Sequence, residues 1–244
     1  MAWAFVANRG SGTDKTSAGL LNVSPIANLN VGAVVVVVGV GDNTSTTNGA
    51  TTDHIVSDSK GNSWTRIAEV TRSPTAVAND GTTVSEWVAQ ITTQILTTDT
   101  ITFDSGWGAP ATAMSIKEFS VGGGNGFSVA GSAIATGTSG TPSVTLSGLS
   151  STTYEWIGAL GVEGPNGDAY TQDADYTNNL SIGTVGGVAA TNQAQRFGTR
   201  NFSGTSDTFN PTCTSRDWGI ILGALLETTP PAAGSKQLAA LGVG

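Results

Sequence analysis

Charged residues are scarce in this chain of 244 residues: they make up 11% of it, and only ten are Lys or Arg. A protein that binds nucleic acid through its phosphates needs clustered basic side chains. Here the net charge is −8, and Arg196 and Arg200 form an isolated basic pair. The composition therefore argues against a nucleic-acid partner and against adhesion to an anionic membrane.

Cysteine and long apolar runs are scarce too. Cys213 is the one cysteine, so an intrachain disulfide is excluded, which fits folding in a reducing cytoplasm. The longest apolar run, VGAVVVVVGVG at 31–41, is about half as long as a membrane helix must be. The first residues, MAWAFVANRG, lack the basic and apolar segments of a signal peptide, so we expect no secretory leader.

No helical period holds over three turns of any segment. Instead, short runs of Val, Ile, Thr and aromatic residues are separated by Gly, Asn, Asp, Ser and Pro, which is typical of an all-β sandwich or barrel. The strands that we predict are 2–7, 17–23, 32–40, 63–71, 82–91, 98–104, 111–121, 127–135, 142–147, 153–163, 176–185, 189–198, 205–211 and 217–227.

Two of these strands are apolar on both faces. They contain AVVVVV at 33–38 and WGIILGALLE at 218–227, and we predict that both are central strands covered on each side. The strand at 82–91 alternates instead. Its Val84, Glu86 and Val88 should share one face, opposite Trp87, Ala89 and Ile91.

The two halves of the chain resemble each other in the order and spacing of short motifs. The corresponding pairs are VGVG (38–41) with LGVE (160–163), Trp64-Thr65 with Tyr176-Thr177, and TDT (98–100) with SDT (206–208). We interpret them as a duplication with pseudo-repeats at about 15–121 and 127–227. The alternative is that any two halves rich in Thr, Val and Gly can be aligned in this way.

A glycine-rich stretch, VGGGNGF at 121–127, joins the two pseudo-repeats. It fits a linker between two small sandwiches or a tight crossover within one. Its length is normal for a connection inside a compact domain, so we favour one β-sandwich over 1–227.

The last residues, 228–244, differ in character from the rest. Pro230-Pro231 should end the last strand and begin an extended arm, and the arm then carries Leu238, Leu241 and Val243. We expect these three apolar side chains to bind a neighbouring subunit or another protein of the same assembly.

No catalytic constellation is recognisable. A Ser-His-Asp triad would have to use His54, the only histidine, and a structural or solvent-facing role fits this residue better. Cys213 is more typical of a small core residue. One histidine and one cysteine do not make a zinc site. We expect no catalytic residue, no metal ligand and no cofactor.

Three weaker alternatives remain open. Calcium could bind the acidic loops at 41–53 or 163–175, although Asn, Asp and Gly in such loops also serve turns. A carboxylate pair from Glu86, Glu118 and Glu155 could hydrolyse a glycoside, but carboxylates on exposed strands also prevent aggregation, which is the favoured interpretation.

Tryptophan could also build a sugar-stacking platform, but most of the six Trp residues lie in apolar strands and are expected in the core. Trp107, in the glycine-rich SGWGAP, is the one that we expect to be exposed. In DSKGNSWT at 58–65, Asp58, Gly61 and Asn62 suit a tight turn, and Trp64 should anchor the core behind it.

The apolar strand 34–40, the motif D-x-x-G-N-x-W-T at 58–65 and the stretch TTDTITF at 97–103 together resemble a group of β-sandwich proteins from tailed bacteriophages. SIKEFSVGG at 115–123 is similar to that group's strand before its mid-chain turn. The resemblance implies a jelly-roll-like fold and a place on the virion. It supplies no catalytic residues.

The function expected from this resemblance is a capsid decoration protein, made in the host cytoplasm, that contacts the major capsid protein and forms a homo-oligomer, with a trimer favoured. The main alternative is a receptor-binding tail or fibre protein that recognises surface glycans. A polysaccharide-degrading enzyme with the same sandwich shape is less favoured.

Overall fold

Antiparallel β-strands build almost all of the described chain in this computed structural model. The structure describes residues 3–16, 19–43, 45–49, 52–77, 80–106, 110–123 and 125–229. Its one helical element among these residues is the 3-10 turn η1 (Ala189–Thr191). The described residues therefore include no helix long and apolar enough to cross a membrane. The prediction of an all-β sandwich-like fold is confirmed.

Two five-stranded sheets form the centre of the molecule. The first has the order β1-β8-β3-β6-β5 and the second the order β13-β14-β11-β17-β9. Their strands are β1 (Ala4–Asp14), β3 (Val34–Gly41), β5 (Thr65–Arg72), β6 (Thr82–Gln90), β8 (Thr112–Ser120), β9 (Gly126–Gly137), β11 (Thr152–Glu163), β13 (Thr177–Gly183), β14 (Gln193–Gly204) and β17 (Trp218–Thr228).

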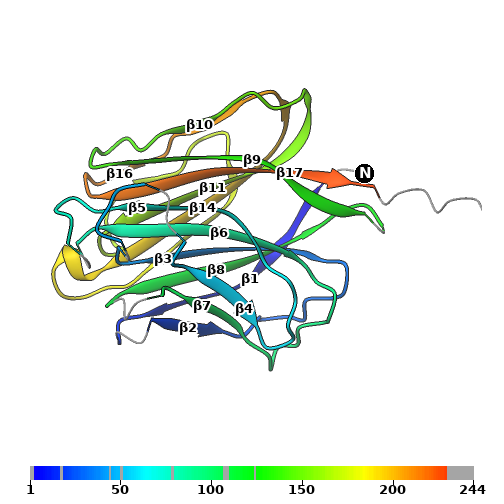
Figure 1. Cartoon of the computed structure of the whole chain (residues 1–244), viewed down its shortest axis with the longest axis horizontal. Coiled ribbons are helices and arrows are strands. Elements are labelled where there is room, and N and C mark those ends of the chain that lie inside the picture. Colours follow the sequence, from blue (N-terminus) through cyan, green and yellow to red (C-terminus); the bar gives the residue numbers. More distant parts are fainter. Residues whose placement is uncertain are drawn as a thin grey trace, which may run out of the picture.

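Smaller sheets cover the outer faces of these two sheets. The order β2-β7-β4 lies on the first sheet, and the pairs β10-β15 and β12-β16 belong to the second. Figure 1 shows the resulting stack, with β10 and β16 at the top and β2, β7 and β4 at the bottom. These strands are β2 (Leu20–Val23), β4 (Ile55–Asp58), β7 (Ile101–Asp104), β10 (Val144–Leu146), β12 (Tyr170–Thr171), β15 (Asp207–Phe209) and β16 (Thr212–Cys213).

The apolar side chains form three separate cores. The central core lies between the two large sheets and contains Val36 and Val38 from β3 together with Ile157 and Phe197 from the second sheet. A second core fills the space between the first large sheet and β2-β7-β4. The third lies under β10 and β15. Each large sheet is therefore apolar on both faces, as sheets inside a layered stack must be.

The valine run explains why β3 is central. All eight residues of β3 are buried, with the side chains of Val36 and Val38 in the central core and those of Val35 and Val37 in the second core. Valine is stiff and β-branched, so a run of it favours a strand that packs on both faces. The prediction that 33–38 and 218–227 are covered on each side is confirmed.

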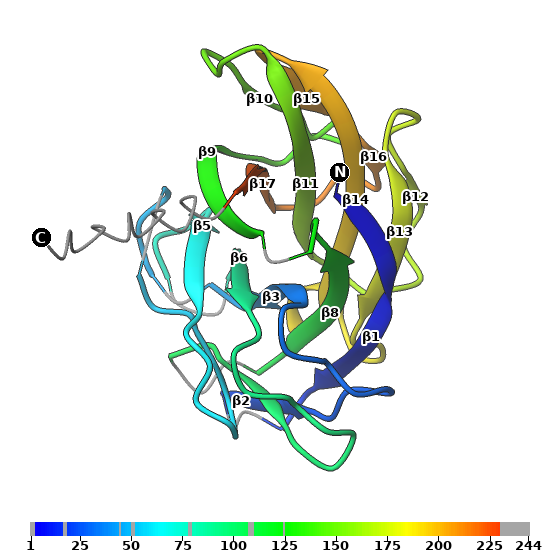
Figure 2. The same ribbon diagram turned by 90° about the vertical axis from the view of Figure 1, so that its right-hand side faces the viewer.

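The second large sheet repeats the strand order of the first. Replacing β1, β8, β3, β6 and β5 by β9, β17, β11, β14 and β13 converts one order into the other. The outer strands can be matched in the same way. In this match β2 takes the place of β10, β4 that of β12, and β7 that of the two short strands β15 and β16. Contacts between the sheets have counterparts too: β1 lies beside β13 and β9 beside β5. Figure 2 shows the strands of the two large sheets facing each other. The side chains of the central core lie between them.

Each half of the chain contains a close contact between a glycine and a phenylalanine ring. A methyl group added at Gly39 in β3 would overlap the ring of Phe103 in β7. One added at Gly158 in β11 would lie 2.6 Å from Cγ of Phe209 in β15. In each half, a Phe ring from the outer layer thus lies flat against a glycine of a central strand. Only glycine permits so close an approach.

This contact changes one detail of the sequence alignment. The motif pair 38–41 and 160–163 matches Gly39 with Gly161, but Gly161 faces Val40 and Val84 in the central core, whereas Gly39 faces Phe103. The two glycines that this match joins therefore lie on opposite faces of their sheets. The pairing of Trp64 with Tyr176 places both residues against outer cores, just before β5 and β13.

The strand pattern in the sequence misses three strands and misplaces several boundaries. The strands β4, β12 and β16 have two to four residues, which is too short for alternation to show. The strand predicted at 2–7 is Ala4–Asp14, and the one predicted at 189–198 ends at Gly204. The strand predicted from 189 begins at Gln193. Before it, the Asn192 side chain donates hydrogen bonds to the carbonyls of Gly186 and Val188, 2.8 Å each, and holds the chain in a turn.

The glycine–phenylalanine contact gives a first prediction. We expect Gly158→Ala to destabilise the protein by about 1–3 kcal/mol, because the added methyl group overpacks the site. The double variant Gly158→Ala/Phe209→Leu should recover part of this loss, since the smaller side chain leaves room. Chemical denaturation of the single and double variants measures both effects.

Gly167→Ala is the matched control, because a Cβ there meets no atom within 4 Å. We expect its free energy of unfolding to stay within about 0.5 kcal/mol of the parent value. Equal effects of Gly158→Ala and Gly167→Ala would contradict the overpacking argument.

Candidate functional site

The turn between β4 and β5 is held together by the carboxylate of Asp58. Its Oδ1 accepts hydrogen bonds from the backbone N–H of Lys60 at 2.8 Å and from the Asn62 side chain at 3.2 Å. Its Oδ2 accepts the indole N–H of Trp64 at 2.7 Å. Gly61 has a φ of +73°, which closes the turn. All acceptor positions of this carboxylate therefore serve the turn itself.

Asn62 joins this turn to the loop that follows β6. Its Oδ1 accepts hydrogen bonds from the backbone N–H groups of Thr92 and Thr93, 2.8 Å each, and its amide donates to the carbonyl of Thr93 at 3.0 Å. Trp64 is half-buried and packs against the second core. The interpretation of DSKGNSWT as a tight connection with a core anchor is confirmed, and no ligand is needed to explain its residues.

His54 is fully buried. Its Nδ1 lies 3.0 Å from Oγ of Ser85, and its ring meets that of Phe103 edge to face at a centroid distance of 4.7 Å. Burial lowers the pKa of His54 to about 3, so the ring is neutral near pH 7. Of the two roles expected for this histidine, structural or solvent-facing, its burial in the core fits the structural one and excludes the solvent-facing one.

The carboxylates of Glu86, Glu118 and Glu155 are buried, which corrects their interpretation as exposed strand residues. Glu118 forms an ion pair with Arg9. Glu86 and Glu155 lie instead on the inner faces of the two large sheets, beside the central core. Burial raises the pKa of Glu86 well above its ordinary value and that of Glu155 to about 7.

Lys117 of β8 shares this space between the sheets. Its Nζ donates to the backbone carbonyl of Asn178 and lies 3.9 Å from the ring centroid of Phe197. Burial lowers its pKa to about 7, and the attraction of Glu155 opposes that shift. Glu155 itself accepts a hydrogen bond from the side chain of Asn201 at 3.1 Å.

The two acidic loops contribute one acidic residue each to the end of the same space. The Gln193 amide donates to Asp42 at 2.6 Å and to the carbonyl of Gly81 at 2.7 Å, while the Gly81 N–H donates to Glu163 at 3.2 Å. Burial raises the pKa of Asp42 to about 6 and that of Glu163 to about 7.

The other acidic residues of 163–175 have separate partners. Asp168 pairs with Arg216 at 2.9 Å, Asp175 pairs with Arg200 at 3.3 Å, and Asp173 accepts the backbone N–H of Asn210 at 2.8 Å. Across the described residues, no three His, Cys, Asp or Glu side chains lie together as metal ligands would.

The five tryptophan side chains that the structure describes are distributed over the cores and do not form a platform. Trp3 is buried in the central core, Trp87 in the second core, and Trp156 and Trp218 in the third, while Trp64 is half-buried. Trp107 and the arm residues Leu238, Leu241 and Val243 lie outside the described residues. Cys213 is half-buried, and burial raises the pKa of its thiol.

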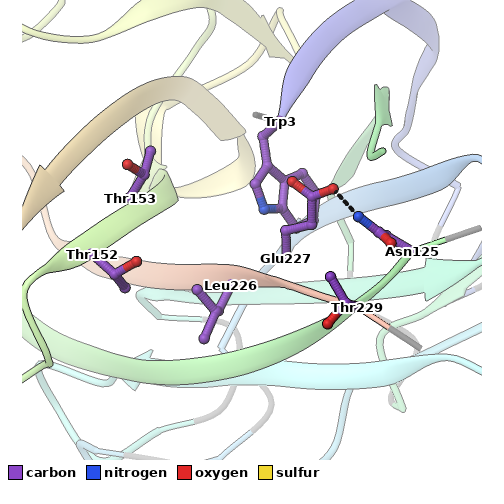
Figure 3. A pocket seen from close by; sticks show the side chains of 7 residues that line it. All are labelled: Trp3, Asn125, Thr152, Thr153, Leu226, Glu227 and Thr229. Atoms are coloured by element: carbon purple, nitrogen blue, oxygen red, sulfur yellow. Dashed lines mark hydrogen bonds between the residues drawn. The ribbon is translucent and has the colours of Figure 1, made fainter. Parts of the chain in front are cut away.

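A shallow hollow of about 360 Å³ lies where β1 begins and β17 ends. Figure 3 shows Thr152 and Thr153 on one side of it, Asn125 and Thr229 on the other, and Trp3 between them. The carboxylate of Glu227 accepts hydrogen bonds from Asn125 and from the backbone N–H of Gly122, which lower its pKa. This end of the molecule therefore offers hydroxyl groups and one charged carboxylate at the point where residues 230–244 follow.

The described site residues do not form a nucleophile, base and orienting group. His54 contacts Ser85 but lies in the core, and the buried carboxylates are distributed along the space between the sheets. The sequence shows Glu86 between Val84 and Val88 on one face, but it does not show that a second sheet covers this face. Because the second sheet cannot be inferred from the local pattern, the sequence predicts the three glutamates at the surface.

The comparisons with known proteins find no matching family model, no similar curated protein and no similar solved structure.

The Asp58 turn gives a second prediction. We expect Trp64→Ala to cost somewhat less than the roughly 3–5 kcal/mol of a fully buried aromatic residue, because this ring is only half-buried. Trp64→Phe keeps most of the packing and removes the hydrogen bond to Asp58, so it should cost about 1–3 kcal/mol. Thermal and urea unfolding measure both. A loss below about 0.5 kcal/mol for Trp64→Ala would show that the ring is no anchor.

Proposed function

We propose that this chain is a non-enzymatic structural protein of a tailed-bacteriophage virion, and most simply a capsid decoration protein. The observation that carries the proposal is the strand order of each half. An eight-stranded jelly roll has one sheet in the order 1-8-3-6 and a second in the order 2-7-4-5. Here β1-β8-β3-β6 and β2-β7-β4 follow that order, with β5 added to the edge beside β6. Jelly rolls recur in viral capsid proteins and in lectins.

The proposed architecture includes the two pseudo-repeats. The correspondence of β1–β8 with β9–β17, and the repeated contact of a glycine with a phenylalanine ring, support two copies of one jelly-roll unit in a single sandwich-like stack. In this interpretation the chain acts as a covalent pair of units. A pair of this kind presents a large and rigid surface, which suits a protein that stabilises a shell by contact.

The way in which charged groups are used also supports a structural role. The described arginines at 9, 72, 200 and 216 form ion pairs with carboxylates of the same chain. On the outer layers, hydroxyl groups bind one another instead, as in Thr145 with Thr208 at 2.8 Å. A surface of this type has few free charges to position a substrate, and it tolerates close contact with a neighbouring protein surface.

The proposed attachment element is the arm at 228–244. The described chain leaves β17 at Thr228 and reaches Thr229 at the rim of the hollow that Trp3 lines. Residues beyond it include Leu238, Leu241 and Val243, each able to contribute about 1.5–3 kcal/mol when buried. We expect this arm to bind another subunit in a homo-oligomer, with a trimer favoured, or the major capsid protein.

A receptor-binding tail or fibre protein is the second candidate. It is favoured by the hollow at the chain ends, where Thr152, Thr153, Asn125 and Glu227 present the hydroxyl, amide and carboxylate groups that bind sugar hydroxyls. A glycan array probed with the full chain tests this candidate, with Glu227→Gln as the matched variant. Glycan binding that Glu227→Gln abolishes would favour the receptor-binding candidate.

The position on the particle is tested by immunogold electron microscopy of the phage that encodes the chain. Gold on the heads supports decoration, and gold restricted to tail tips supports receptor binding. Purified particles that carry no label, while the same antibody detects the free protein, would overturn both.

The arm gives a third prediction. A chain that ends at Thr229 should keep nearly the same melting temperature, since the three cores lie within the residues before it, but it should form a smaller oligomer or bind capsids more weakly. The triple variant Leu238→Ser/Leu241→Ser/Val243→Ser should behave in the same way. Light scattering and co-sedimentation with capsids measure these effects.

Lys236→Ser is the matched control, because it changes the same arm without removing an apolar side chain. We expect it to behave like the parent chain. Unchanged oligomer size and unchanged capsid binding in the truncated chain would contradict the role of the arm.

A further inference from the structure

Glu86 is the most unusual side chain of the central core. It is fully buried, and neither of its carboxyl oxygens has a hydrogen-bond partner among the described residues. A Cβ built at Gly223, on β17 of the opposite sheet, would lie 2.7 Å from Oε2 of Glu86. The carboxyl group therefore reaches across the space between the sheets and rests against the backbone of the second half.

Among the residues that the structure describes, no charge near Glu86 compensates an ionised carboxylate. Its neighbours across the ladder are Val38 on β3 and Ala68 on β5, and Gly223 faces it from β17. The ionisable groups on the inner faces of the neighbouring strands are Lys117 and Glu155, and burial is the one cause that shifts the pKa of Glu86. An unpaired carboxylate in such a place is very costly, so the group takes up a proton instead.

The same space holds further carboxyl groups at its end. Asp42 and Glu163 are buried there and joined through Gln193 and Gly81. Beside them, Arg72 at the end of β5 pairs with Asp217, just before β17, at 2.7 Å and so connects the two large sheets. We call the inner faces with Asp42, Glu86, Lys117, Glu155 and Glu163 the ionisable seam.

We propose that protons hold the ionisable seam closed, so that raising the pH from about 5 to about 8 loosens the packing of the two large sheets while the outer layers stay packed. Each half keeps an apolar core on its outer side, and the seam between the halves holds Glu86, whose carboxyl oxygens have no hydrogen-bond partner among the described residues. This proposal concerns the fold itself and stands independently of the proposed function.

The direction in which stability changes with pH follows from the linkage between folding and proton binding. Carboxyl groups whose pKa is raised by folding stabilise the native state fully below their unfolded values of 3.8 to 4.5. That stabilisation is lost as the pH rises through their folded values, about 6 for Asp42 and about 7 for Glu155 and Glu163. Glu86 acts in the same direction, because burial raises its pKa well above the ordinary value.

Two other groups act in the opposite direction. Folding lowers the pKa of Lys117 from 10.5 to about 7, so stability from this group is present above pH 10.5 and is lost as the pH falls toward 7. Folding lowers the pKa of His54, outside the seam, from 6.5 to about 3. The stability that this group contributes is lost as the pH falls from 6.5 toward 3. Between about pH 5 and 7, the seam carboxyl groups outnumber His54, so stability should fall as the pH rises.

The test uses the full chain, scanned by calorimetry at pH 5, 6, 7 and 8 and constant ionic strength. We expect the melting temperature of the parent chain to fall by roughly 5 °C or more over this range. Glu86→Gln cannot ionise, so its curve should be flatter and should lie above the parent curve at pH 8. If Gln prevents folding, Glu86→Met replaces it.

Glu118→Gln is the matched control, because Glu118 is also buried but is paired with Arg9 outside the seam. Its melting temperature should follow the same slope as that of the parent chain. Hydrogen exchange, corrected for the intrinsic effect of pH, should show faster exchange at pH 8 in β3, β6 and β11 than in β2, β7 and β10.

The proposal is overturned if the melting temperature of the parent chain is constant or rises between pH 5 and 8. It is also overturned if Glu86→Gln and Glu118→Gln have equal slopes. Uniform acceleration of exchange in all layers would show that the chain loosens as a whole and that the seam is not the weak layer.

Discussion

The close approach of the two large sheets depends on glycine in the second sheet. A side chain added at Gly161 would meet Val40 and Val84 within about 3 Å, and one added at Gly219 would meet Val70 at 3.2 Å. At Gly223 it would meet Glu86 and Ile67. The valine-rich face of the first sheet therefore packs directly against backbone of the second. Three positions without side chains in β11 and β17 make room for the side chains of β3, β5 and β6.

This packing also explains why the central space contains polar groups without being a pocket. Side chains that reach across a thin layer end against backbone, as the carboxyl group of Glu86 does at Gly223. Polar side chains that are longer than valine form hydrogen bonds with one another in the space between the sheets. Gln195, for example, donates a hydrogen bond to Ser115 at 2.6 Å. Such bonds fix the register of one sheet on the other, while a group without a partner, such as Glu86, keeps its proton.

The sequence predicts most of the longer strands because each of them carries a local pattern of residues. It predicts the burial of their faces poorly, because burial depends on strands that are distant in the sequence. Alternation placed Val84, Glu86 and Val88 on one face, and the structure agrees. The sheet that covers this face comes from β11 and β17, far along the chain, and no local pattern reveals it. The Asp58 turn was predictable for the opposite reason, since its bonds lie within 58–64 apart from those of Asn62.

The paired arrangement of the halves accounts for the low charge of the chain. Open sheet edges invite pairing with other chains, and many proteins protect them with charged residues. Here β1 lies beside β13 and β5 beside β9, so each edge of one large sheet faces an edge of the other. The hydroxyl of Ser132 in β9 even donates to the carbonyl of Ile67 in β5, at 3.2 Å. Since the second half covers the edges of the first, the strands do not need exposed carboxylates to prevent pairing with other chains. The glutamates that the sequence assigned to this role can therefore lie in the interior.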